Sequence, residues 1–231
     1  MKRIFVVLSA IVLSVGAVVF AQTQITITEA AVPPAIDADL SEWNTAALVS
    51  AFPEDASSRA GILYFMYDKD NLYVAGEVKD ESPLMNDKVG TDAIWNGDCI
   101  EVYICADPNA DPKRMEYGPN DRQFGLAMAP KPSTWCWQNG KPLEGAVVVT
   151  KEVEFGSDKH PGYVFEAKIP QKSIHPNLNL KALKGKKIGF AAAIDFSNAE
   201  GSAREIQHSW SFASNGAAWN NPSVWGTAFI K

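Results

Sequence analysis

The sequence predicts an all-β fold, namely a two-sheet antiparallel β-sandwich of the jelly-roll or immunoglobulin-like kind with long inserted loops. Short stretches in which apolar and polar residues alternate recur along the chain. They are rich in Val, Ile, Phe and Tyr and are separated by clusters of Pro, Gly, Asn and Asp. No stretch of twelve residues keeps a helical period. About ten strands in roughly 210 residues is typical of a two-sheet sandwich.

The expected elements follow from this alternation. In chain order, the strands are 25–29, 61–67, 72–79, 99–105, 123–129, 146–155, 163–169, 187–196, 206–212 and 226–230. The clearest hairpin joins the second and third of them through Asp68 to Asn71, because Asp and Asn tolerate turn conformations. Short helical turns are expected at 40–44 and 171–174, and the Pro- and Gly-containing segments 107–121 and 129–145 are expected to be long loops.

Residues 1–21 have the pattern of a secretory signal peptide. Lys2 and Arg3 precede an apolar run from 4 to 20, and cleavage is expected near Ala21. The rest, 22–231, is predicted to form one domain, secreted or periplasmic, with no stable insertion in a membrane after cleavage. The alternative interpretation of the apolar run is a transmembrane anchor.

The composition narrows the class of partner. The chain of 231 residues carries 21 basic and 27 acidic residues, a net charge of −6. A nucleic-acid partner is not expected, because a phosphate backbone needs a basic surface. Seven tryptophans among 24 aromatic residues in a chain with only 21% charged residues argue against disorder, and the places of these rings in the fold become the main functional question.

Three cysteines leave at least one thiol unpaired. Cys99 and Cys105 lie at the two ends of one expected strand, about 20 Å apart, which is beyond the reach of a disulfide. Any bridge must therefore use Cys136, and we favour the interpretation that all three are small half-buried apolar residues.

The strand 99–105 carries the strongest functional signal. Alternation places Ile100 and its equivalents on the core face and Glu101 on the outer face, among apolar neighbours. Trp95, just before the strand, can project over the same outer face. An aromatic plate beside a carboxylate suits a sugar, whose C–H faces lie on the ring while its hydroxyls donate to the acid. The alternative is an exposed Glu and a Trp that closes the end of the sandwich.

A set of motifs in order resembles the family 9 carbohydrate-binding module from about residue 24 to the C-terminus. The motifs are Ile36-Asp37-Ala-Asp39-Leu-Ser-Glu42-Trp43, Tyr67-Asp68-Lys-Asp70-Asn-Leu72-Tyr73, Trp95-Asn-Gly-Asp98-Cys-Ile-Glu101, Arg122-Gln-Phe, Gly162-Tyr-Val-Phe-Glu166, Gly185-Lys-Lys-Ile-Gly189-Phe190 and Trp225-Gly226. The resemblance implies a sugar-binding β-sandwich that works beside secreted hydrolases of plant polysaccharides, with mono- or oligosaccharides as ligands and often with structural calcium.

The resemblance also implies the site residues. One Trp opens the strand that carries the acid, here Trp95 with Glu101, and a second ring comes from a late loop. We prefer Trp219 to Trp210 for the second ring, because Trp219 lies among Gly and Asn with no evident core to fill. Arg122 stands where the family places a sugar-binding arginine. Asn220 and Asn221 are the expected additional partners of sugar hydroxyls.

Two positions depart from the family pattern, and the other tryptophans have different expectations. Ile100 stands where sugar-binding members can carry a lysine, and Phe124 where a polar residue is expected, which predicts altered specificity or weak binding. Four further tryptophans are then sorted: Trp43 and Trp225 are expected to be structural, and Trp135 and Trp137 stay open between binding platform and loop cover.

Calcium, catalysis and haem are the remaining expectations. Asp68 and Asp70 could contribute to a calcium site, although Asp in a tight turn also has a backbone explanation. Asp98 and Glu101 have opposite parity and cannot form a glycosidase pair, so a non-catalytic module is predicted. The alternative function is a haem b-binding electron-transfer sandwich, for which the chain offers three ligand candidates: Met66, Met128 and His208.

Overall fold

The computed structural model describes residues 24–43, 50–51, 59–211 and 217–231. Its strands are β1 (Gln24–Glu29), β2 (Ser50–Ala51), β3 (Ala60–Tyr67), β4 (Asn71–Lys79), β5 (Cys99–Cys105), β6 (Asp121–Ala127), β7 (Ser133–Cys136), β8 (Val147–Phe155), β9 (His160–Pro170), β10 (Lys187–Ser197), β11 (Arg204–Trp210) and β12 (Gly226–Ile230). Helical turns are η1 (Leu40–Glu42), η3 (Ile94–Asn96), α1 (Gln171–Ile174) and η4 (Pro222–Val224). The predicted all-β class is confirmed.

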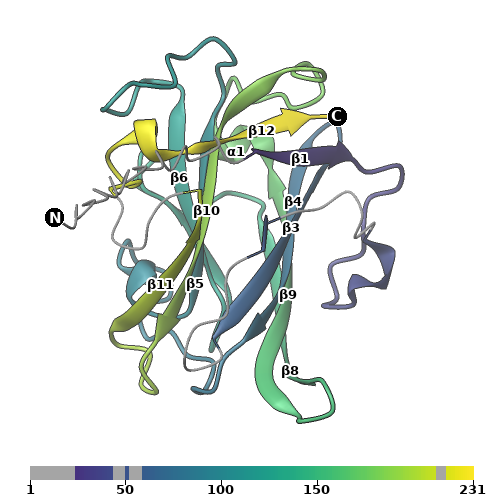
Figure 1. Cartoon of the computed structure of the whole chain (residues 1–231), viewed down its shortest axis with the longest axis vertical. Coiled ribbons are helices and arrows are strands. Elements are labelled where there is room, and N and C mark those ends of the chain that lie inside the picture. Colours follow the sequence, from purple (N-terminus) through teal and green to yellow (C-terminus); the bar gives the residue numbers. More distant parts are fainter. Residues whose placement is uncertain (1–23, 44–49, 52–58, 212–216) are drawn as a thin grey trace, which may run out of the picture.

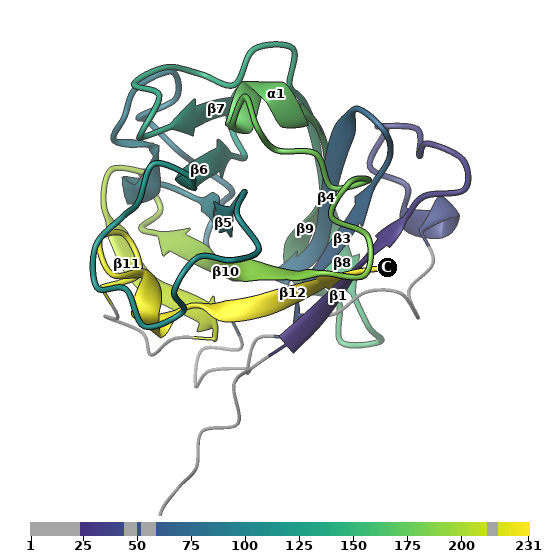
Figure 2. The ribbon, with the colours of Figure 1, turned by 90° about the horizontal axis from the view of Figure 1, so that it is seen from above.

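Two groups of strands enclose a common interior (Figures 1 and 2). One has the order β7-β6-β5-β10-β12, with β11 also on β10, and the other has the order β3-β4-β9-β8, with β2 on β3. β1 joins them, because Gln24 to Ile27 pair with β12 and Thr28 to Glu29 pair with β3. Both pairings of β1 are parallel, whereas every other pairing of named strands is antiparallel, so the predicted antiparallel sandwich is correct apart from β1.

Most predicted strands agree with the structure to within a few residues, and the largest difference lies in a predicted loop. The segment 129–145 contains β7, which pairs with β6. Its alternating stretch is only four residues long and follows two prolines, so the sequence pattern is weak there. Residues 107–120 form a loop as predicted.

The core lies between the two groups of strands, and the alternation of β5 sets which side chains enter it. Ile100, Val102 and Ile104 belong to the large apolar cluster, whereas Tyr103 and Cys105 belong to a separate cluster on the other face. Across the interior, Phe65 of β3 meets Phe190 of β10 edge to face, with ring centroids 5.0 Å apart. All three cysteines are free thiols, and they are fully buried where half-buried side chains were expected.

The predicted signal segment 1–21 lies outside the described residues. Within the described ranges, no helix is long and apolar enough to cross a membrane.

A buried carboxylate ties the N-terminal segment to the sandwich. Glu166 of β9 is fully buried, and its Oε1 accepts a hydrogen bond from the Trp43 indole nitrogen at 2.6 Å. Its Oε2 accepts from the backbone nitrogens of Asp37 and Ala38 at 2.8 and 2.6 Å. Trp43 itself packs against Tyr64, in agreement with the structural role expected for it.

The first prediction concerns this carboxylate. Glu166→Ala leaves two buried N–H groups and one part-buried N–H group without their acceptor, so we expect the free energy of unfolding to fall by about 3 kcal/mol. Urea unfolding measures the change. Glu154→Ala is the control, because that side chain on β8 is 61% exposed. A loss below about 1 kcal/mol for Glu166→Ala would show that the N-terminal segment is held by other contacts.

Candidate ligand-binding site

A buried carboxylate forms the floor of the candidate site. Glu101 of β5 is only 2% exposed. Its Oε2 accepts hydrogen bonds from the hydroxyl of Tyr103 and from Nε2 of Gln123, the latter at 2.8 Å. Its Oε1 lies 3.5 Å from Nη1 of Arg204. One carboxylate oxygen is therefore occupied by neutral donors, and the other lies near a cation.

A second acid lies beside Glu101. Asp195 of β10 is fully buried, and its Oδ1 accepts from Nη1 of Arg204 at 2.9 Å and from Nε2 of Gln207 at 2.8 Å. Burial is the largest cause that raises the pKa of Asp195 well above its ordinary value, and the neighbouring Glu101 carboxylate raises it further. The carboxyl of Asp195 therefore holds its proton to a higher pH than a free aspartate does, and Nη1 of one guanidinium contacts both acids of the floor.

Three indoles surround this floor. Trp95 from η3, Trp137 after β7 and Trp219 before η4 line a cavity of about 640 Å³, together with Glu101, Tyr103, Gln123, Arg204, Glu205, Ile206 and Gln207. Trp219 is 63% exposed and Trp95 is 38% exposed. The Arg204 guanidinium lies 5.0 Å from the centroid of the Trp95 ring, a cation–π contact that fixes the orientation of this indole.

Small residues on the neighbouring strands open the space above the floor. In the sheet, Glu101 is flanked by Ala193 of β10 and Gly125 of β6. A Cβ atom on Gly125 would lie 2.8 Å from Cη2 of Trp137, closer than real side chains approach. The missing side chain therefore lets Trp137 lie directly against the sheet at the edge of the cavity.

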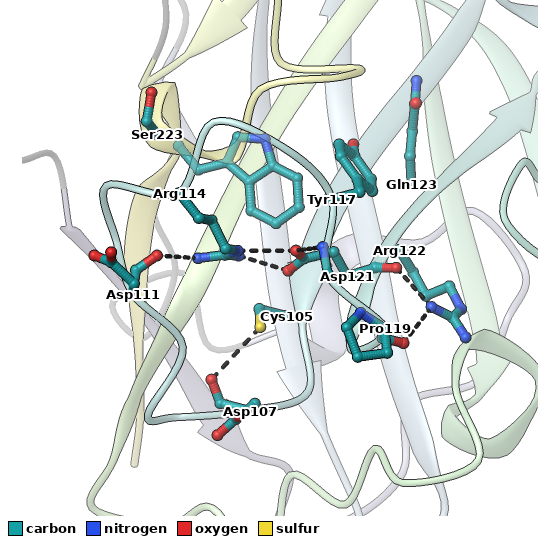
Figure 3. Close-up of polar contacts among 12 residues, drawn as sticks. Cys105, Asp107, Asp111, Arg114, Tyr117, Pro119, Asp121, Arg122, Gln123 and Ser223 are labelled. Carbon is teal, nitrogen blue, oxygen red and sulfur yellow. Dashed lines mark hydrogen bonds and ion pairs between the residues drawn. The ribbon is translucent and has the colours of Figure 1, made fainter.

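The structure brings together three of the residues predicted for the site, Trp95, Glu101 and Trp219. It does not bring Arg122 or Trp210 into the cavity. Arg122 shares its face of β6 with Phe124, and it donates to Asn139 Oδ1 and to the Pro119 and Asp121 carbonyls. Figure 3 shows Arg122 and Gln123 pointing to different sides of the strand.

The other predicted partners have structural contacts. Trp210 is 8% exposed and packs against Phe190 in the large core, so the preference for Trp219 agrees with the cavity lining. Asn221 caps η4 by accepting from the Ser223 nitrogen. Asn220 is exposed in the turn after Trp219 but does not line the cavity. Ile100 and Phe124, the departures from the family pattern, are both buried in the core.

Sequence reasoning missed Gln123, Arg204 and Gln207 and left Trp137 undecided. The alternation along β6 is a signal for Gln123, because it places Gln123 on the face opposite to the core residue Phe124. In the structure Gln123 pairs with Tyr103 of β5. No local signal marks Arg204, since a register shift between Phe196 and Ser197 sets its position opposite β10. Trp135, the other open case, is half-buried beside Ile94 and Cys99 and does not line the cavity.

The turn expected to contribute to a calcium site has the carboxylate oxygens of Asp68 in local hydrogen bonds. Both oxygens of Asp68 accept hydrogen bonds, from the nitrogens of Asp70 and Asn71 and from the Tyr73 hydroxyl, which is the bonding of a closed turn. No group of three or more His, Cys, Asp or Glu side chains suited to a metal occurs within the described ranges. Calcium at Asp68 and Asp70 stays a prediction.

The haem ligands are not gathered at one place. Met128 is buried in the large core, whereas Met66 belongs to the cluster around Trp43 on the other face of its sheet. His208 packs edge to face against Phe196. No observation in the described part of the chain favours the haem alternative.

The fold and the cavity together define a β-sandwich with a cavity that lies between indoles over a polar floor. Residues 36–231 match the family described as "Carbohydrate family 9 binding domain-like", and the chain belongs to this family. Comparison with curated proteins gave no match.

Solved structures support the fold. A family 9 carbohydrate-binding module from Caldicellulosiruptor kristjanssonii in complex with cellotriose aligns with a TM-score of 0.64 and 19% identity, covering 90% of this chain and 94% of that one. The module in complex with glucose aligns with a TM-score of 0.63 and 20% identity, covering 90% and 96%. A putative carbohydrate-binding protein from Bacteroides uniformis gives 0.57 and 12%, covering 90% and 99%.

The second prediction tests the raised pKa of Asp195. Because its folded-state pKa is raised, folded protein binds more protons than unfolded protein above about pH 4, so Asp195 lowers the free energy of unfolding as pH rises. Asp195→Asn keeps the oxygen that accepts from Arg204 and Gln207 but cannot ionise. We expect the variant to gain stability relative to the natural chain as the pH rises above about 4, by at most about 1.4 kcal/mol per pH unit. Denaturant unfolding at a series of pH values measures the difference, and a difference independent of pH would contradict a raised pKa of Asp195.

Proposed function

We propose that this chain binds a pyranose sugar in the cavity between Trp95 and Trp219, without chemical turnover. The observation that carries the proposal is the convergence of indoles from separate segments over the buried Glu101. Membership of the family and the sugar complexes of its structural neighbours support the same class of ligand.

The contacts suggest how a neutral sugar is held. The C–H faces of the ring stack on the exposed parts of Trp95 and Trp219. A sugar hydroxyl donates to Oε1 of Glu101, the oxygen that lies 3.5 Å from Nη1 of Arg204, and other hydroxyls accept from Arg204 or Gln207. Since stacking on each ring contributes on the order of 1 kcal/mol, we expect micromolar or weaker affinity.

The arrangement of the acids supports a binding role rather than hydrolysis. Glu101 and Asp195 both contact Nη1 of Arg204, so they lie side by side beneath the cavity and not on opposite sides of a bound sugar. Asp98 accepts from the backbone nitrogens of Met85 and Ser197, away from Glu101. Neither pair therefore has the arrangement of a glycosidase.

The setting of the binding event is also a proposal. The basic start and apolar run of residues 1–21 support secretion or delivery to the periplasm. Plant polysaccharide fragments as ligands, cooperation with secreted glycoside hydrolases and structural calcium are supported by the family resemblance. Mass spectrometry of the exported protein tests the first part, because cleavage near Ala21 gives a mature chain that begins close to Gln22.

The third prediction concerns the two exposed indoles. Trp95→Ala and Trp219→Ala each remove a stacking surface worth about 1 kcal/mol, so we expect each to raise the dissociation constant for the tightest sugar about fivefold. Isothermal titration with glucose, cellobiose, cellotriose and xylobiose, with and without a calcium chelator, measures this. Val32→Ala, which changes an apolar side chain that is 79% exposed and does not line the cavity, is the control.

Two results would count against the proposal. Absence of heat with every sugar at millimolar concentration argues against sugar binding by this chain. Binding that survives both tryptophan substitutions places the sugar elsewhere on the molecule. Loss of binding on chelation alone would identify a calcium requirement and leave the position of the sugar to the tryptophan variants.

A further inference from the structure

A single backbone carbonyl holds the turn that carries Trp219. The oxygen of Ala218 accepts hydrogen bonds from the Tyr117 hydroxyl and from the Trp225 indole nitrogen, both at 3.0 Å. Ala218 is fully buried, although the next residue, Trp219, is 63% exposed. A carbonyl oxygen has two lone pairs, so these two hydrogen bonds use the full accepting capacity of Ala218, the residue directly before the exposed ring.

Trp225 connects this carbonyl to the floor of the cavity. Its ring lies 5.8 Å from the ring of Tyr103, whose hydroxyl donates to Glu101. Tyr117 meets Trp225 edge to face, at 5.3 Å and 89°. The contacts of Trp225 therefore reach both the floor of the cavity and the turn that presents the exposed indole.

The segment that contributes Tyr117 is itself anchored by a buried ion pair (Figure 3). Asp121, 1% exposed at the start of β6, accepts from Nε and Nη2 of Arg114 at 2.8 and 2.5 Å. The Gly118 nitrogen also donates to Asp121, at 2.8 Å, and Nη1 of Arg114 donates to the Asp111 carbonyl. The segment is thereby fixed to the strand that also supplies Gln123 to the floor.

The same guanidinium covers the other partner of the Ala218 carbonyl. Cζ of Arg114 lies 5.5 Å from the centroid of the Trp225 ring. The turn that carries Trp219 is closed by its own backbone, because the nitrogens of Asn220 and Asn221 both donate to the Ala217 carbonyl. Its hydrogen bond to the segment 107–121 comes from the Tyr117 hydroxyl.

We propose that the segment 107–121 positions Trp219 for sugar stacking, and that Tyr117 is the positioning residue, acting through the Ala218 carbonyl. This inference rests on the sugar-binding function proposed above. Tyr117 need not touch the sugar. Its hydroxyl restricts the backbone before Trp219, so that less conformational freedom is lost when a sugar binds.

Tyr117→Phe tests the inference, because it removes one hydroxyl and keeps the ring against Trp225. We expect the dissociation constant for sugar to rise about two- to tenfold, the range for one lost hydrogen bond. In a Trp219→Ala background the same substitution is expected to leave the residual affinity unchanged. Tyr64→Phe is the matched control, since it loses a hydroxyl that donates to Glu77, a residue that does not line the cavity.

Hydrogen exchange supplies a readout that does not need sugar. In Tyr117→Phe we expect faster exchange of the amides of Asn220 and Asn221, with β5 and β10 unchanged. Unchanged amides together with unchanged affinity would overturn the inference, as would an equal loss of affinity in the Trp219→Ala background. If the natural chain binds no sugar, the proposed function fails. Faster exchange in Tyr117→Phe would then still support the restraint on the turn by the Tyr117 hydroxyl, and unchanged exchange would exclude that restraint.

Discussion

The two-residue side-chain period of β5 is the constraint on which the rest of the structure depends. It sends Ile100, Val102 and Ile104 into the core and leaves Glu101 and Tyr103 on the opposite face of the same strand. β5 lies between β6 and β10, so this outer face is flanked on both sides by paired strands. A shift of one residue in register would exchange the two faces and place a carboxylate in the apolar interior. Packing of the core and placement of the site therefore have one cause.

The same face explains the electrostatics of the site. A carboxylate that is 2% exposed is costly unless it is paired and hydrogen-bonded, and Glu101 has neutral donors on one oxygen and Arg204 near the other. Burial and the neighbouring Glu101 raise the pKa of Asp195, so the second acid is protonated more readily than a free aspartate. Arg204 satisfies this pair and also holds Trp95 by its cation–π contact. One guanidinium thus couples the charge of the floor to the orientation of an indole.

Residues on strands with clear alternation were the easiest to place from the sequence. Glu101 and Trp95 were identified because the start and parity of their strand are unambiguous, and Trp219 because a Trp among Gly and Asn has no core to fill. The prediction of Arg122 was wrong because it followed the position of the residue in the family motif. The alternation of side chains along β6 instead places Gln123 on the outer face. Gln207 reaches the floor because it pairs with Asp195 of β10, and Arg204 because it pairs with Ser197 across a register shift. No local pattern reveals either pairing.

The sequence by itself determined the β class, the sequence positions of most strands, the family and the faces of β5, because side-chain period and turn chemistry are local properties. The tertiary structure alone decided which segments meet at the cavity. The indoles of Trp95, Trp137 and Trp219 are far apart in the chain, and their convergence depends on strand order and on the small residues Gly125 and Ala193 beside Glu101. It also decided that Tyr117 and Trp225 share the Ala218 carbonyl, since hydrogen bonds between distant segments depend on the folded chain.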